Sequence, residues 1–72
     1  MYNGHKNWNH WNVSLWLFND EALYRMVLRC LHRSATKDNA ARWIAGLLDG
    51  QSTPDGAPYT YTSIRAALVG VR

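Results

Sequence analysis

Three arginines repeat at the spacing of one helical turn, and the binding of anionic groups is the chemistry that the sequence most clearly indicates. Arg25, Arg29 and Arg33 follow one another at intervals of four residues. On a helix this spacing forms a single row with neighbours about 6 Å apart. Guanidinium groups stay charged and bind carboxylates or phosphates through paired hydrogen bonds. The row is therefore a solvated helix face, a contact to nucleic-acid phosphates, or a contact to a partner protein.

Catalytic and metal chemistry have weaker support in the sequence. Asp20 and Glu21 stand at the expected start of a helix, where negative charge interacts favourably with the helix dipole. This explains the two residues better than a catalytic acid–base pair does. The three histidines and the single cysteine do not have the spacings of metal ligands. Cys30 lies on an apolar stripe and is interpreted as a core residue. We expect no enzyme activity, no metal and no cofactor.

The composition limits the size and class of the protein. A chain of 72 residues is one small domain, 1–72, in which we expect 1–7 to be a loose N-terminal arm. Eight Lys and Arg against five Asp and Glu give a net charge of +3. This excess is modest for a nucleic-acid-binding protein but sufficient to attract an acidic partner. The single cysteine and the lack of a leader or long apolar run favour a soluble, cytosolic protein.

Aromatic residues dominate the first expected helix, which runs from about residue 8 to 18. Apolar side chains at helical spacing predict one core-facing stripe, formed by Trp8, Trp11, Leu15 and Trp16. Val13 and Leu17 lie away from that stripe. Asn12 falls on the tryptophan side and, if buried, must have hydrogen-bond partners, because an unpaired buried amide costs about 1–3 kcal/mol.

Two further helices have clearer signals. A second helix over 21–33 is expected to begin at an Asn19 cap. Its core-facing residues are predicted to be Leu23, Met26, Val27, Cys30 and Leu31. A third helix over about 37–49 begins at a Thr36 cap and stops before Gly50. Its apolar side is predicted to comprise Ala40, Trp43, Ile44, Leu47 and Leu48. Gly46 within it suggests a close helix contact.

The remaining segment predicts a loop and a last helix. Thr53-Pro54-Asp55-Gly56 has the residues of a tight turn. The last helix is expected to start near residue 62 or 63, and its inward residues are predicted to be Ile64, Ala67, Leu68 and Val71. The fold class is therefore all-α: a compact bundle of about four short helices, with one loop containing a Pro/Gly turn before the last helix.

The aromatic segment also carries a resemblance. NWNHWNVSLWLFNDEALYR resembles a family of short, largely uncharacterised proteins of phages and other mobile elements, whose recurring pattern is W-N-V-x-L-W-x-x-N-D-E-x-L-Y. The matching residues are Trp11, Asn12, Val13, Leu15, Trp16, Asn19, Asp20, Glu21, Leu23 and Tyr24. The segment TPDGAPYTYTSIRAALVG resembles the tail of those proteins. The resemblance implies a phage-type origin and, by association, inhibition of a host factor.

We therefore expect a small phage-type binding protein that inhibits a host defence complex, as an anti-CRISPR-like inhibitor does, in the host cytoplasm. The partner is a host protein or a ribonucleoprotein complex, bound through a basic and aromatic helical surface. The expected contacts are Arg25, Arg29, Arg33, Tyr59 and Tyr61. Two alternatives remain: a small nucleic-acid-binding regulator that uses the arginines on phosphates, and an oligomeric structural module.

Overall fold

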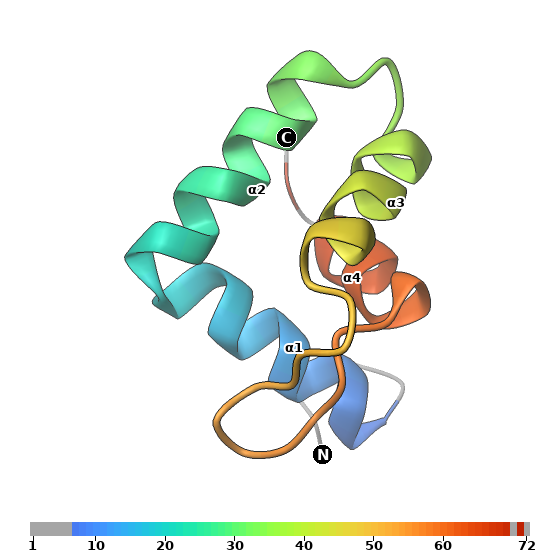
Figure 1. Ribbon diagram of the computed structural model, residues 1–72. Coiled ribbons are helices and arrows are strands. Elements are labelled where there is room, and N and C mark those ends of the chain that lie inside the picture. Colours follow the sequence, from blue (N-terminus) through green and yellow to red (C-terminus); the bar gives the residue numbers. More distant parts are fainter. Residues whose placement is uncertain (1–6, 70, 72) are drawn as a thin grey trace.

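The computed structural model describes residues 7–69 and 71, and these residues form an all-α fold (Figure 1). The helices are α1 (Trp8–Asn19), α2 (Glu21–Arg33), α3 (Lys37–Leu47) and α4 (Tyr61–Leu68). Within the described ranges there is no strand, only an antiparallel bridge between Ser52 and Pro58. No described helix has the length and apolar character needed to span a membrane. The predicted fold class is confirmed.

The four helices pack in a closed cycle. Helices α1 and α3 each pack against both α2 and α4. The two remaining pairs, α1 with α3 and α2 with α4, do not pack against each other within the described residues. The core at the centre of the cycle includes Val13, Leu17, Val27, Cys30, Ile44, Ile64 and Leu68. Each helix thus supplies at least one residue to the same apolar cluster.

A single residue joins α1 to α2. The Asp20 backbone N–H donates to the carbonyl of Trp16 at 3.1 Å, while its carboxylate accepts from Leu23 N at 3.0 Å. Asp20 therefore ends one helix and caps the next. The prediction of Asn19 as the cap is wrong, because Asn19 is still helical and is exposed. The Asp20 backbone is extended, and this separates the two helices.

The aromatic stripe predicted for α1 is wrong. Its buried residues are Asn12, Val13 and Leu17, and the last two were expected to lie away from the tryptophan stripe. Trp8 is exposed and the Trp16 side chain is half-buried. An indole carries an N–H donor that needs a partner, so it settles at the boundary between apolar and polar surroundings. The smaller aliphatic residues fill the interior of the cycle instead.

Helix α3 begins at the predicted cap, and three of the five residues predicted for its apolar side are buried, whereas the other two are not. Thr36 Oγ1 accepts from Asn39 N at 3.1 Å. The buried side comprises Ala40, Ala41, Ile44 and Leu48, whereas Trp43 and Leu47 are 41% and 50% exposed. The two alanines allow α3 to approach its neighbours closely, so the bulkier residues remain at the edge. A side chain added at Gly46 would meet nothing within 4 Å, so the expected close contact there is wrong.

The loop 48–60 contains the predicted turn. Gly56 N donates to Thr53 O at 2.9 Å, which closes a turn around Pro54 and Asp55. Gly56 has φ +98, a value that favours glycine. The loop then leads into α4, which starts earlier than predicted because Thr60 caps it, accepting from Ser63 N at 3.1 Å.

A buried amide ties this loop to α1. Asn12 Nδ2 donates to Asp55 Oδ2 at 2.8 Å, and Asn12 Oδ1 accepts from Thr53 Oγ1 at 2.5 Å. Trp16 Nε1 donates to the same carboxylate oxygen at 2.9 Å, and Thr53 Oγ1 accepts from Ala57 N at 3.0 Å. The expectation that a buried Asn12 has partners is confirmed. We call these four side chains, Asn12, Trp16, Thr53 and Asp55, the loop network.

The expected N-terminal arm, 1–7, has one residue in the described part of the chain. Residues 1–6 lie outside the described residues. Asn7, which was assigned to the arm, is instead the cap of α1, because its Oδ1 accepts from His10 N at 2.9 Å. Its backbone carbonyl also accepts from Trp11 N at 3.1 Å. The first described residue is therefore already part of the helical fold.

Replacing Asn12 with Ala is expected to destabilise the protein by about 1–3 kcal/mol, because Thr53 and Asp55 lose buried hydrogen-bond partners. Chemical denaturation followed by circular dichroism measures the change. Asn19→Ala is the matched control on the same helix, since Asn19 is exposed and caps nothing. Its expected effect is within about 0.5 kcal/mol. Equal losses for the two variants would contradict the structural role of Asn12.

The loop network also makes stability depend on pH. Hydrogen bonds from Asn12, then from Trp16, lower the pKa of Asp55, with desolvation opposing the shift. A lowered folded pKa stabilises the fold above the unfolded value of about 3.9, and this contribution is lost as pH falls through the folded value. We expect Asp55→Asn to make the acid-side decline in the urea midpoint shallower. Asp49→Asn, at an exposed carboxylate outside the network, should leave that decline unchanged.

Candidate functional site

The row of three arginines lies on the exposed side of α2. Val27 and Cys30 of this helix are buried, and Leu23, Met26 and Leu31 pack against the same core, as predicted. Turning this side inward leaves Arg25, Arg29 and Arg33 exposed. The core therefore fixes the orientation of the row, and we call these three residues the basic row.

The members of the basic row differ in what they contact. Arg25 pairs with Glu21, one turn earlier on the same helix. Arg29 and Arg33 form no hydrogen bond or ion pair with any residue in the described part of the chain. Two guanidinium groups on one helix face are therefore available without breaking an existing pair.

The carboxylates of the chain are mostly engaged elsewhere. Asp20 caps α2, Glu21 pairs with Arg25, and Asp55 belongs to the loop network. Asp38 on α3 pairs with Arg65 on α4, and that hydrogen bond holds the pKa of Asp38 below its usual value. Four of the five acidic residues thus already have a partner within the fold. The positive charge on the outer face of α2 consequently remains uncompensated at Arg29 and Arg33.

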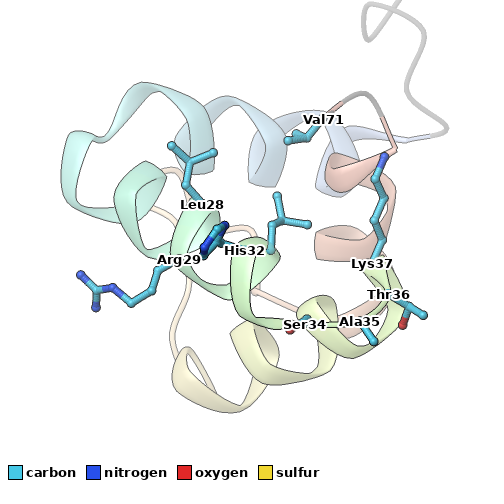
Figure 2. A pocket seen from close by; sticks show the side chains of 9 residues that line it. Leu28, Arg29, His32, Ser34, Ala35, Thr36, Lys37 and Val71 are labelled. Carbon is cyan, nitrogen blue, oxygen red and sulfur yellow. The ribbon is translucent and has the colours of Figure 1, made fainter.

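A hollow of about 690 Å³ lies beside the basic row (Figure 2). It is bounded by α2, by the turn into α3 and by the chain that follows α4. Its lining residues are Leu28, Arg29, Leu31, His32, Ser34, Ala35, Thr36, Lys37 and Val71. Figure 2 shows Lys37 extending along the hollow towards Val71, whereas Arg29 extends outwards from α2. The hollow and the basic row therefore meet at Arg29.

The two tyrosines predicted as contacts do not join this surface. Tyr59 is only 8% exposed, and burial raises its pKa, with the charge of Asp20 adding to the shift. The expectation that Tyr59 is exposed is wrong, because its backbone N–H donates to Gln51 O and draws the returning loop inward. Tyr61 is 37% exposed, as expected. It lies on α4, which does not pack against α2, and the Arg42 guanidinium sits 5.9 Å above its ring centre.

Cys30 has the properties of a core residue, as predicted. It is buried among the apolar residues of the bundle. Burial raises the pKa of its thiol, and the charge of Arg29 opposes this shift only in part. The group is therefore a neutral thiol near pH 7 and a poor nucleophile or metal ligand. Among the described residues, no three His, Cys, Asp or Glu side chains gather in a metal-binding arrangement.

Sequence reasoning missed the residues of the hollow. Leu28 is 41% exposed although it is a large aliphatic residue on an otherwise polar helix face. The sequence did contain a signal for this exposed apolar residue, since Leu28 lies outside the predicted core stripe. Lys37 and Val71 had no such signal, because only the tertiary packing brings them towards α2.

Comparison with known proteins gives a family without an assigned activity. The chain belongs to a family of unknown function (DUF7249), whose model matches residues 1–70. Neither the curated proteins nor the solved structures gave a match. The site must therefore be interpreted from its own chemistry.

Removing the two unpaired arginines should scarcely change stability. Arg29→Ala and Arg33→Ala are each expected to shift the free energy of unfolding by no more than about 0.5 kcal/mol, since exposed side chains without partners contribute little. Arg65→Ala is the matched control, because it breaks the pair with Asp38 that links α3 to α4. Denaturant titration should show a larger loss for Arg65→Ala. A larger loss for the α2 variants would indicate a structural role for those arginines.

Proposed function

We propose that this is a non-enzymatic binding protein that docks α2 on an acidic surface of a partner protein. The observation that carries the proposal is the exposure of Arg29 and Arg33 without an acidic partner in the described part of the chain. Arginine is enriched at the energetic centres of protein interfaces because its planar group binds carboxylates at two points. Arg29 and Arg33 can bind a carboxylate without first breaking an ion pair in the described part of the chain.

The scaffold of α2 suits such a role. Val27 and Cys30 anchor the helix in the core, and Asp20 caps its first turn. The backbone that carries Arg29 and Arg33 is thus ordered before a partner arrives. Ordering in advance reduces the entropy cost of association, so that more of the contact energy appears as affinity. The helix also fixes the spacing of the two backbone positions that carry the charges.

The resemblance of the aromatic segment to short phage proteins supports a host defence complex as the partner. In this proposal the protein acts in the host cytoplasm as an inhibitor of such a complex, for example a CRISPR effector. A CRISPR effector offers both protein surface and nucleic-acid phosphates. An experiment must therefore show which of the two is bound. The arginine row on one exposed helix face also fits the competing function, a nucleic-acid-binding regulator.

One feature favours a protein partner over nucleic acid. Leu28 is exposed beside Arg29 and offers apolar area that a phosphate backbone does not use. Protein interfaces commonly combine apolar residues with arginine.

Affinity capture tests the proposal. The tagged protein is expressed in bacteria that carry a CRISPR effector complex, and stoichiometric host proteins are identified after capture. We expect Arg29→Glu and Arg33→Glu to lower the recovery and the measured affinity about tenfold or more each, equivalent to about 1.4 kcal/mol. Binding should also weaken as salt rises, since exposed charges are screened.

Arg42→Glu is the matched control for these reversals. It makes the same change in charge on α3, away from the basic row. Unchanged recovery with Arg42→Glu, together with loss for both α2 variants, supports the proposal. Recovery of no stoichiometric protein, or equal loss for all three variants, contradicts it. Retarded migration of DNA or RNA at low salt, lost in the α2 variants, favours the regulator instead.

A further inference from the structure

We propose that the hollow beside α2 seats one apolar side chain of an acidic segment of a partner protein. This inference rests on the proposed function, since Arg29 belongs both to the basic row and to the lining of the hollow. It goes further by naming the chemistry of the bound segment. That segment carries an apolar anchor between carboxylates.

The apolar residues of the hollow require an apolar anchor. Leu28 and Leu31 come from α2, and Val71 comes from the chain after α4. Leu28 remains 41% exposed, and Leu31 and Val71 are only partly covered. A partner side chain that enters the hollow would remove the apolar area of all three residues from water, which favours association.

The charged residues of the hollow require carboxylates. Arg29 and Lys37 are the Arg and Lys residues at the hollow, and no Asp or Glu is among the lining residues of the described chain. Lys37 Nζ donates to Val69 O at 3.2 Å, which uses one of its three donors. Two donors remain for a ligand. Arg29 extends on the outer side of α2 and Lys37 on the opposite side of the hollow (Figure 2). A segment crossing α2 can therefore place a carboxylate towards each.

The hollow is formed before binding. Helices α2 and α4 do not pack against each other, so a space remains where the cycle has no direct contact. The Lys37 bond to Val69 O holds the chain after α4 opposite α2. The Thr36 cap fixes the start of α3 at the same edge. Because these contacts are internal, a bound segment need not order them.

A second copy of this chain does not fit the chemistry of the hollow. Four of its five carboxylates are engaged in caps, pairs and the loop network. The net charge of +3 also opposes the approach of two basic faces. A segment of another protein that is rich in Asp and Glu meets both requirements.

A titration followed by nuclear magnetic resonance tests the inference. The probe is a short synthetic peptide with a central leucine flanked by glutamates, added to isotopically labelled protein. We expect amide shifts to concentrate at Leu28, Leu31, Lys37 and Val71. The Leu28→Ser variant should bind the peptide about tenfold more weakly, because the apolar contact is lost. Leu47→Ser, a matched leucine that is 50% exposed on α3, should bind as the unaltered protein does.

Two altered peptides separate the apolar and the charged parts. A peptide with serine in place of the leucine should bind about tenfold more weakly, and so should one with glutamines in place of the glutamates. Equal binding of either altered peptide overturns the inference. So do shifts spread evenly over the surface, or a Leu28→Ser variant that binds normally while retaining its thermal stability.

The experiments distinguish failure of the inference about the hollow from failure of the proposed function. Arg33 does not line the hollow, so Arg33→Glu tests the basic row alone. If that variant loses the captured host protein while Leu28→Ser retains it, the basic row is supported and the seat in the hollow is overturned. If the peptide binds as expected but no host protein is captured, the hollow inference stands and the proposed function fails.

Discussion

The buried amide of Asn12 is the constraint on which the arrangement of the chain depends. Its hydrogen bonds reach Thr53 and Asp55, 41 and 43 residues later, and join the first helix to the loop that precedes the last. Since both polar ends of the amide are satisfied, burial in the core carries little penalty. The loop held in this way delivers α4 to α1 and completes the cycle of helices (Figure 1). A purely apolar contact would not define the position of the turn so narrowly.

Helix α2, like each helix of the cycle, packs against two neighbours among the described helices, and its outer side is free of helical neighbours. That side carries the basic row, and its edge towards the C-terminus borders the hollow. Its exposure is therefore a result of topology as well as of composition. In α4, by contrast, Arg65 is tied to Asp38, and its charge serves the fold.

The sequence predicts some of these elements well because a single physical signal decides them. Helix α2 has one apolar stripe and one basic row, and both were placed correctly. The Thr36 cap and the turn at Thr53–Gly56 follow from local hydrogen bonding. The tryptophans of α1 and Trp43 were misplaced because an indole is both apolar and a donor, and helical spacing alone cannot assign it to the core or to its edge. The hollow was missed because Leu28, Lys37 and Val71 meet only through tertiary packing.

The distribution of charge links the fold to partner choice. Caps, helix pairs and the loop network use the carboxylates of Asp20, Glu21, Asp38 and Asp55. Of the five acidic residues, only Asp49 is then left to neutralise Arg29 or Arg33. Because the carboxylates are used in this way, the excess of positive charge is concentrated at Arg29 and Arg33 on α2, although the net charge is small. The basic row selects a partner that carries negative charge. Leu28 and the other apolar residues of the hollow select a partner that has an apolar side chain of matching shape. Together they describe a more specific partner than either feature does alone.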